Sequence, residues 1–324
     1  MSMNQRILEL FEQSDGAFLS GEEISGQLNI SRTAVWKHIE RLREQGYQFE
    51  AVPRKGYRLT AKPVKLDLAR VVTGLETASF GRHLKYYDEV ESTQTVAHGL
   101  VQEGAQEGTL VLAEQQNAGR GRMGRKWHSP KGKGIWMSLI LKPGIPLQMT
   151  PQLTLLFAVA LCRTIRGYLG LEAGIKWPND LLIRGRKVSG ILLESNAEDE
   201  RLLHVIAGVG ISVNLEPQDY PEELKEIATS LAIEAGHPID REALLCRFLR
   251  DLEQLYALYR EQGFAPIRTL WEAQSVSLHR PIRVQTAQGA VEGTAESIDE
   301  SGALLIRLQD GSLQKLYSGV VEFR

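Results

Sequence analysis

The first sixty residues place apolar side chains at the spacing of short helices. Ile7, Leu10 and Phe11 form one stripe, and Ile24 and Leu28 lie one turn apart in a second segment. Residues three or four positions apart share one face of an α-helix, so each stripe predicts a short amphipathic helix with an inward face.

A third helix is predicted over 32–45, where Val35, Ile39 and Leu42 repeat at the spacing of one buried face. Ser31 precedes this helix and is a favourable N-cap. With the apolar side chains turned inward, the residues left on the outer face are Arg32, Thr33, Trp36, Lys37 and Arg41.

Two short strands are predicted next, over 47–52 and 56–60, and the turn between them is basic. Helices followed by such a hairpin predict a winged helix-turn-helix over 1–63. From Arg32 to Lys62 there are eight basic and three acidic residues, which places positive charge on the third helix and the hairpin. The predicted DNA contacts are Ser31, Arg32, Thr33, Trp36, Lys37, Arg41, Arg54 and Lys55. A protein-interaction domain stays the alternative, because winged helices also bind proteins.

The pattern changes over residues 64–275, where apolar strands alternate with helices. Predicted strands cover 84–89, 109–114, 135–141 and 205–213. Predicted helices cover 92–103, 151–167, 241–262 and 265–274. Residues 276–324 contain short strands separated by turns with glycine, which suits a small barrel, and none of their side chains suggests catalysis.

The composition limits the classes of protein. A chain of 324 residues with 43% hydrophobic and 24% charged residues is typical of a globular protein of two or three domains. Its formal charge of −2 confines any DNA contact to a local surface. Cys162 and Cys246 lack metal-binding spacing, so we expect reduced core cysteines. We also expect a cytoplasmic protein without a membrane partner, because we find no signal region and no long apolar run.

The segment Gly119–Gly134 differs from the rest of the chain because it has six basic and no acidic residues. The basic residues are Arg120, Arg122, Arg125, Lys126, Lys131 and Lys133. Unpaired cations repel one another unless an anion lies among them, and glycines let backbone N–H groups approach a ligand. The segment therefore predicts a site for a phosphate-bearing ligand, with a solvated flexible loop as the alternative.

Gly119, Gly121 and Gly124 match the G-x-G-x-x-G spacing of dinucleotide-binding proteins. That fingerprint requires a following helix and an acidic residue about twenty positions later. Trp127–Pro130 follows instead, and no acidic residue lies between Gly119 and Thr150. These observations exclude a Rossmann site here.

Two later stretches add candidate chemistry. Lys176–Asp180 ends in an Asn-Asp pair at the start of a strand that leads into the basic turn Arg184–Lys187. Each of these residues alone is more often structural, but a second basic turn favours a binding site. The strand over 205–213 contains glycines and ends near Asn214, which is typical of close backbone approach to a ligand.

In combination these motifs resemble those of biotin–protein ligases. The matching stretches are EST at 91–93, GRGRMGRKW at 119–127, KWPND at 176–180, GRKVSGILLE at 185–194 and GVGISVN at 208–214. With the winged helix, the chain resembles the bifunctional kind, which is also the repressor of the biotin biosynthetic operon. The resemblance runs in order through nearly the whole chain.

The resemblance implies an α+β multidomain fold. After the winged helix-turn-helix come a mixed α/β domain similar to the core of class II aminoacyl-tRNA synthetases and an SH3-like β-barrel. It implies that biotin and ATP, with Mg²⁺, form biotinyl-5′-AMP, and that biotin passes to a lysine of the biotin carboxyl carrier protein of acetyl-CoA carboxylase. The adenylate would also be the corepressor, favouring a homodimer that binds operator DNA.

The same resemblance implies roles for individual residues. Those implied for biotin are Ser92, Thr93, Gln94, Gln116, Arg120, Gly121, Arg122 and Lys187. Those implied for ATP and the adenylate are Arg120, Arg122, Arg125, Lys126, Trp127, Asn179, Ser212 and Asn214. Arg122, Lys187 and Asp180 are the implied catalytic residues, and Asp180 is also the candidate Mg²⁺ ligand.

The sequence departs from the family pattern at three positions, with Gln94 and Ser212 in place of Asn and Met123 in place of Arg. Two other functions stay open: a lipoyl–protein ligase, and a regulator that senses biotin without transferring it. Retained catalysis is favoured by the intact set of Arg120, Arg122, Lys187 and Asp180.

Overall fold

The computed structural model describes residues 3–44, 47–61, 65–198 and 201–323, and the chain divides into two compact units, 1–66 and 67–324. The predicted domain boundary between residues 63 and 64 lies outside the described residues. The predicted boundary between residues 275 and 276 lies within the second unit, next to the end of a helix at Gln274, and it stays a prediction.

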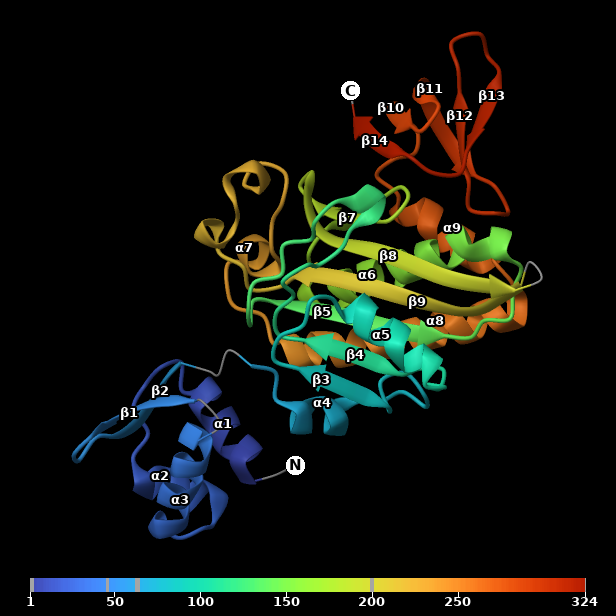
Figure 1. The fold of residues 1–324 in the computed structure, drawn as a ribbon. Helices are drawn as coiled ribbons and strands as arrows, with labels where there is room; N and C mark the ends of the chain where they lie inside the picture. The colour runs from blue at the N-terminus through green and yellow to red at the C-terminus, as the bar shows by residue number, and fades with distance from the viewer. Residues whose placement is uncertain (1–2, 45–46, 62–64, 199–200, 324) are drawn as a thin grey trace. The chain divides into compact units, whose positions relative to one another are not determined.

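The first unit has the predicted order of three helices and a hairpin among its described residues (Figure 1). The elements are α1 (Met3–Gln13), α2 (Gly21–Leu28), α3 (Arg32–Glu44), β1 (Gln48–Val52) and β2 (Gly56–Ala61). Val35, Ile39 and Leu42 are at most 1% exposed, as the spacing predicts. The Ser31 hydroxyl accepts a hydrogen bond from the Ala34 N–H at 3.1 Å, which confirms the N-cap of α3.

A seven-stranded sheet forms the centre of the second unit, in the order β3-β4-β5-β9-β8-β7-β6. The strands are β3 (Leu84–Tyr87), β4 (Leu110–Ala113), β5 (Gly134–Leu141), β6 (Ala173–Lys176), β7 (Asp180–Ile183), β8 (Arg186–Glu198) and β9 (Arg201–Ser212). β3 and β4 are parallel, and the other neighbours are antiparallel. The predicted pairing of the strands that flank the basic loop is confirmed, because β4 pairs with β5.

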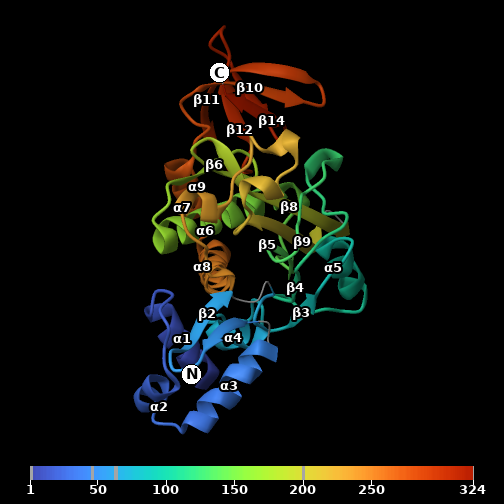
Figure 2. The same cartoon turned by 90° about the vertical axis from the view of Figure 1, so that its left-hand side faces the viewer.

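Helices cover both faces of this sheet. α5 (Thr93–Gln102) packs on β4, β5 and β9, whereas α6 (Thr150–Leu169) packs on β6, β7 and β8. α8 (Arg241–Gln262) and α9 (Ala265–Gln274) pack on α6, and Figure 2 shows these three helices on the side opposite α5. The short helices α4 (Leu68–Gly74) and α7 (Leu231–Ala235) complete the list of described helices in this unit.

A buried ion pair fixes the base of the basic loop. The Arg241 guanidinium lies 2.9 Å from the Glu114 carboxylate and donates to the Gly134 carbonyl at 3.0 Å. Glu114 follows β4 and Gly134 begins β5, so one side chain of α8 holds both ends of the intervening loop. Burial of an ion pair is tolerated here because the guanidinium also finds a carbonyl acceptor.

The C-terminal residues form a five-stranded antiparallel sheet in the order β13-β12-β11-β10-β14. The strands are β10 (Pro281–Thr286), β11 (Gly289–Ile298), β12 (Leu304–Arg307), β13 (Leu313–Leu316) and β14 (Val320–Phe323). This confirms a small C-terminal β-domain, although β14 was not predicted. The Trp177 indole donates to the Gly302 carbonyl and the Gln152 amide donates to the Glu300 carbonyl, so this domain packs on the central sheet.

Candidate active site

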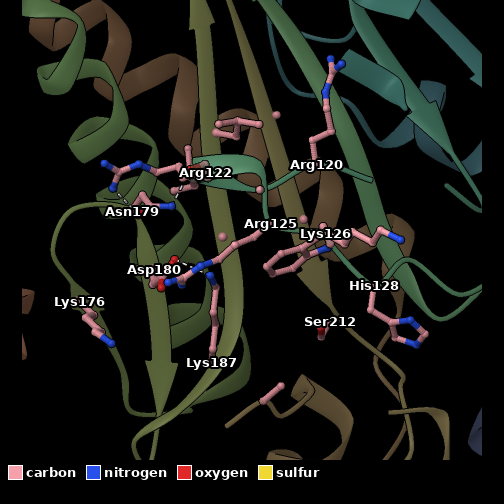
Figure 3. Close-up of a pocket in the computed structure, with 18 of the residues that line it drawn as sticks. Arg120, Arg122, Arg125, Lys126, His128, Lys176, Asn179, Asp180, Lys187 and Ser212 are labelled. Atoms are coloured by element: carbon pink, nitrogen blue, oxygen red, sulfur yellow. Dashed lines mark hydrogen bonds and ion pairs between the residues drawn. The ribbon is translucent and has the colours of Figure 1, made fainter. Parts of the chain in front are cut away.

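A cavity of about 610 Å³ opens in the second unit, among the basic loop, strands β7 to β9 and the C-terminal domain (Figure 3). Among the residues predicted to bind biotin or nucleotide, those that line it are Ser92, Thr93, Gln94, Gln116, Arg120, Gly121, Arg122, Arg125, Lys126, Trp127, Asn179, Asp180, Lys187 and Ser212. Folding therefore brings together motifs that are more than a hundred residues apart in the chain, from Ser92 to Ser212.

One end of the cavity is neutral and already hydrogen-bonded. Ser92 caps α5, and Gln116 Oε1 accepts from both the N–H and the hydroxyl of Thr93, at 2.9 and 3.1 Å. The Ser138 hydroxyl donates to Thr93 Oγ1, and Gln116 Nε2 donates to the Ser129 hydroxyl at 2.9 Å. These mutual bonds hold the hydroxyls and amides in fixed positions before any ligand is present.

Gln94 differs from its neighbours at this end because its side-chain oxygen has no hydrogen-bond partner among the described residues. The side chain is 3% exposed, and its Nε2 donates weakly to the carbonyls of Leu192 and Ile206. Among the described residues, no donor reaches the buried Gln94 Oε1. A buried acceptor without a partner is costly, so this oxygen is available to a ligand N–H.

Two glycines of β9 form the floor of the cavity. A Cβ at Gly208 would lie 3.0 Å from the Gln94 carboxamide carbon, and a Cβ at Gly210 would lie 2.3 Å from the Trp127 indole nitrogen. Real Cβ atoms essentially never make a contact as short as the one at Gly210, and the contact at Gly208 would require Gln94 to shift by a few tenths of an ångström. The glycines therefore leave the space that Gln94 and Trp127 occupy, as the sequence pattern predicts.

The other end of the cavity is cationic, and two of its cations already contact other side chains of the site. Lys187 Nζ lies 2.6 Å from the Asp180 carboxylate and 5.1 Å from the centre of the Trp127 ring. Arg122 donates to Asn179 Oδ1 at 3.0 Å, and Asn179 is held by bonds to the Ile191 backbone. Figure 3 shows Arg122, Arg125, Asp180 and Lys187 converging on one region.

Burial shifts the acid–base behaviour of two cations at this end. Burial lowers the pKa of the Arg122 guanidinium, against the attraction of Asp180, and Arg125 lowers it further. Burial likewise lowers the pKa of Lys176, and repulsion from Lys187 and Arg125 adds to the effect. A region that lowers the pKa of its own cations binds an added anion favourably.

The basic loop is more ordered than its sequence suggests. Gly121 N–H donates to the Arg125 carbonyl and Trp127 N–H donates to the Gly119 carbonyl, so residues 119–127 fold back as a tight hairpin. Met123 at its tip is 66% exposed with a positive φ of 57°. The loop is therefore a defined structure that presents cations at one wall of the cavity.

The expectation of six unpaired cations in this segment is wrong. Lys131 pairs with Asp88 at 2.5 Å, and Lys133 pairs with Asp219 at 3.0 Å. Arg120 lies 3.3 Å from Glu194 and points away from the other cations in Figure 3. The acids come from segments distant in sequence, so the loop sequence alone could not reveal them.

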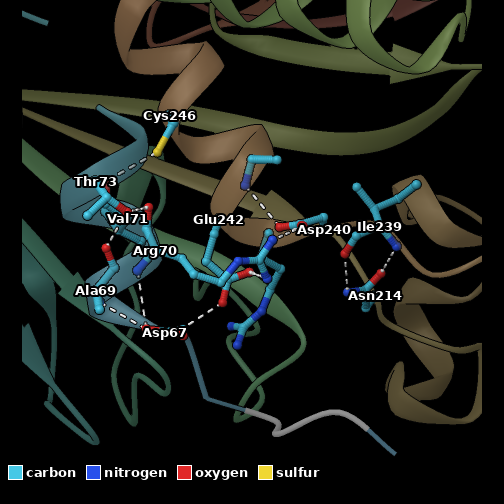
Figure 4. Close-up of polar contacts among 12 residues, drawn as sticks. Asp67, Ala69, Arg70, Val71, Thr73, Asn214, Ile239, Asp240, Glu242 and Cys246 are labelled. Atoms are coloured by element: carbon cyan, nitrogen blue, oxygen red, sulfur yellow. Dashed lines mark hydrogen bonds and ion pairs between the residues drawn. The ribbon is translucent and has the colours of Figure 1, made fainter. Parts of the chain in front are cut away.

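Asn214 is the one predicted cavity residue that does not line the described cavity. Its side chain donates to the Ile239 carbonyl at 2.9 Å and accepts from the Ile239 N–H at 2.8 Å (Figure 4). Asp240, which follows Ile239 in the chain, caps α8 and pairs with Arg70 of α4. Asn214 thus connects the end of β9 to the start of α8.

Sequence reasoning missed several lining residues. Lys176 belongs to a quoted motif but received no role, and it lies in the cavity wall with Nζ 5.4 Å from the Phe323 ring. The segments 224–228 and 319–322 also line the cavity. Neither segment has a distinctive motif, and the close approach of β14 is a tertiary contact that local pattern does not encode.

The predicted DNA-contacting residues are exposed in the first unit. Ser31, Arg32, Thr33, Lys37, Arg41, Arg54 and Lys55 are all exposed. Trp36 is 51% exposed, which is unusual for so large an aromatic side chain. An exposed surface of this kind is available for phosphate and base contacts.

None of the described helices combines the length and apolarity needed to cross a membrane. Within the same residues, no group of three or more His, Cys, Asp or Glu side chains could hold a metal ion.

Three protein families match the chain, in the order of its predicted parts. The HTH domain matches residues 4–58, the Biotin/lipoate A/B protein ligase family matches 86–212, and the Biotin protein ligase C terminal domain matches 278–324. The fold and the cavity therefore define a protein ligase of the biotin/lipoate class that carries a helix-turn-helix domain.

Individual relatives narrow the class. The bifunctional ligase/repressor BirA of Bacillus subtilis is 50% identical over 99% of this chain and 98% of its own length. That of Escherichia coli is 30% identical over 96% of this chain and 94% of its own length. A structure of the Aquifex aeolicus biotin protein ligase with biotin and ATP, 29% identical, covers 75% of this chain and 99% of its own with a TM-score of 0.64. The chain belongs to the bifunctional ligase/repressor family.

Proposed function

We propose that this protein joins biotin to ATP in one cavity and then transfers biotin to a carrier-protein lysine. As a member of its family it is an ATP-dependent biotin–protein ligase and a transcriptional repressor. The observation that carries the proposal is that one cavity has a buried neutral end beside a cationic end. Biotin has the matching shape, with a neutral ureido ring at one end and a carboxylate at the other.

The neutral end suits the ureido ring. Among the described residues, Gln94 Oε1 is a buried acceptor without a partner, and Ser92 and Thr93 line the same cavity. A ureido group offers two N–H donors and a carbonyl acceptor, so it can bond to these groups without bringing charge into the site. We assign Ser92, Thr93, Gln94 and Gln116 to this role.

The cationic end suits the reacting anions. In the first step a biotin carboxylate oxygen attacks the α-phosphorus of ATP, the bond between the α- and β-phosphates breaks, and pyrophosphate leaves. The carboxylate and the triphosphate repel each other, so cations must be fixed between them. We assign Lys187 and Arg122 to this role, with Arg120, Arg125 and Lys126 supplying further positive charge and Trp127 and Ser212 contacting the nucleotide.

In the second step the lysine amine attacks the acyl carbon of biotinyl-5′-AMP, the bond to AMP breaks, and the amine loses a proton. Asp180 lies 2.6 Å from Lys187 Nζ and faces the same region, where it can orient the incoming amine. Asp180 and Asn179 also offer the oxygen atoms that would hold Mg²⁺ together with ATP phosphates. One or two carboxylates plus phosphates are a usual Mg²⁺ environment, and Asp180 would supply one carboxylate.

The regulatory half of the proposal concerns the winged helix. We infer that it contacts operator DNA of biotin biosynthesis genes through the exposed face of α3 and the basic hairpin tip, with biotinyl-5′-AMP as corepressor. The adenylate would order the basic loop and favour a homodimer in the cytoplasm, which raises operator affinity. Sedimentation with and without the adenylate tests this, and an unchanged monomer fraction would contradict it.

One assay tests the enzymatic claim. The protein is incubated with ATP, Mg²⁺, biotin and the apo carrier protein, and the carrier is weighed by mass spectrometry. Covalent biotin on one carrier lysine is expected. Labelling with lipoate in place of biotin would indicate a lipoyl–protein ligase, and adenylate binding without transfer would indicate a regulator that only senses biotin. Either result would overturn the proposal.

A further inference from the structure

Glu234 is a buried carboxylate that lies outside the cavity, behind the basic turn that carries Lys187. Its side chain is 1% exposed. One oxygen lies 2.6 Å from Arg186 and accepts from the Thr229 hydroxyl at 2.7 Å, and the other lies 3.6 Å from Arg184. A carboxylate removed from water requires such partners, so these contacts are energetically coupled.

The backbone of Lys187 is held by the same segment that Glu234 holds. Lys187 N–H donates to the Ile227 carbonyl at 2.8 Å, and Thr229 N–H donates to the Lys187 carbonyl at 2.8 Å. Thr229 in turn donates its hydroxyl to Glu234. The carboxylate therefore reaches Lys187 from two directions, through the adjacent Arg186 and through Thr229.

Strand geometry explains why the side chains of Arg186 and Lys187 point in opposite directions. Successive side chains of a strand point to opposite faces, so Arg186 turns toward Glu234 and Lys187 turns toward the cavity. The register of β7 and β8 shifts between Leu181 and Leu182, and Val188 is the extra residue on β8. A bulge of this kind re-aims neighbouring side chains and occurs often beside active sites.

We propose that Glu234 is a positioning residue for Lys187, acting through Arg186 and Thr229 without touching substrate. The inference rests on the proposed role of Lys187 in adenylate formation. Residues 226–228 also line the cavity wall. Thr229 follows this segment, and the Lys187 N–H donates to its Ile227 carbonyl. The carboxylate thus fixes the reacting cation and this wall relative to each other, far from the neutral end.

The test compares Glu234→Gln with a matched buried carboxylate. Asp251→Asn is the control, because Asp251 is buried on α8 and accepts from Thr164 at 2.9 Å, away from the cavity. We expect Glu234→Gln to slow adenylate formation by at least about tenfold, since small displacements of a reacting group have large effects on rate. Because Lys187 is also assigned to the biotin carboxylate, the Kd for biotin without ATP should rise as well. Asp251→Asn should keep the wild-type rate and Kd even if it lowers Tm equally.

A double-mutant cycle identifies the route. Arg186→Gln should slow adenylate formation by itself, and the double variant should be no slower than Glu234→Gln, because both changes break one connection. Additive effects would overturn the proposal. So would a folded Glu234→Gln variant with the wild-type rate, or an equal loss of rate in the Asp251→Asn control. A wild-type protein that forms no adenylate would instead refute the proposed function.

Discussion

The two ends of the cavity differ in how they are prepared before ligands bind. At the neutral end, Thr93 and Gln116 are buried or half-buried and bonded to each other, and only Gln94 Oε1 lacks a partner among the described residues. At the cationic end, Lys187 already has an acidic partner that a ligand must replace or share. The first end is preformed, whereas the second exchanges internal pairs for ligand contacts.

This difference follows from the chemistry of burial. A neutral hydroxyl or amide can be buried at small cost when it is hydrogen-bonded, so folding can fix it permanently. A group of uncompensated cations would destabilise the fold, and here Asp180 pairs with Lys187 and Glu194 pairs with Arg120. Arg122 is held by a hydrogen bond to the neutral amide of Asn179. Selectivity for the uncharged ring and reactivity toward phosphate are therefore built in different ways.

The strongest challenge to this comparison is Lys187→Ala. We expect adenylate formation to fall by about 10²–10³, the typical effect of removing one group that stabilises transition-state charge. Biotin-dependent exchange of pyrophosphate into ATP measures it. Lys85→Ala, which changes an exposed lysine of β3, should have no effect. Similar losses in both variants would mean that only overall charge matters.

Arg122→Gly removes a cation from the loop without touching the neutral end. Charge-assisted hydrogen bonds contribute about 1.5–3 kcal/mol, so the adenylate should escape roughly 10- to 100-fold faster. Released adenylate would then label lysines of an unrelated protein added to the assay, which mass spectrometry detects. If labelling stays confined to the carrier protein, the loop does not retain the adenylate.

Gln94→Leu tests the preformed end. The substitution keeps most of the volume but removes the waiting acceptor, so a ureido N–H would be buried without a partner at a cost of about 1–3 kcal/mol. The Kd for biotin, measured by calorimetry without ATP, should rise about tenfold or more. The rate of adenylate formation at saturating biotin should change little, and a large fall in that rate would contradict the separation of the two ends.

Lys176→Arg is expected to have the smallest effect, visible only in the pH dependence. Burial, with repulsion from Lys187 and Arg125, lowers the pKa of Lys176, so this lysine loses its charge at a lower pH than an ordinary lysine. As the pH rises toward that value, the KM for ATP should increase. Arginine stays charged, so the variant should show this increase only at higher pH. Coincident profiles would show that the Lys176 charge does not assist ATP binding.

The sequence predicted the order of domains and the buried faces of the winged helix, and every residue that it assigned to the cavity lines it except Asn214. These predictions succeed because periodicity and motifs are local features of the sequence. The motifs also contain the polar residues that the fold brings together in the cavity. It did not predict the acids that pair with the basic loop, because Asp88 and Asp219 lie outside the motifs and the motif that ends at Glu194 does not reveal its partner. Asn214 shows the converse, since a motif position near the cavity is used for a structural contact with Ile239.

The sequence also did not predict the residues that act on the site through the backbone. Glu234 lies in a short helix with no motif, and only the contacts of Thr229 and Arg186 reveal its connection to Lys187. The segment 320–323 forms an edge strand whose approach to the cavity depends on how the C-terminal domain packs.

The glycine floor of β9 has a consequence for anyone who wishes to redesign the enzyme. A methyl group at Gly210 would overlap Trp127 and one at Gly208 would press against Gln94, so substitution of these glycines would displace the side chains that line the cavity. Libraries should instead target the walls, where Met137 and Leu192 line the cavity with replaceable apolar side chains. Substitutions at these side chains would change the width of the cavity, whereas the backbone of β9 sets its depth.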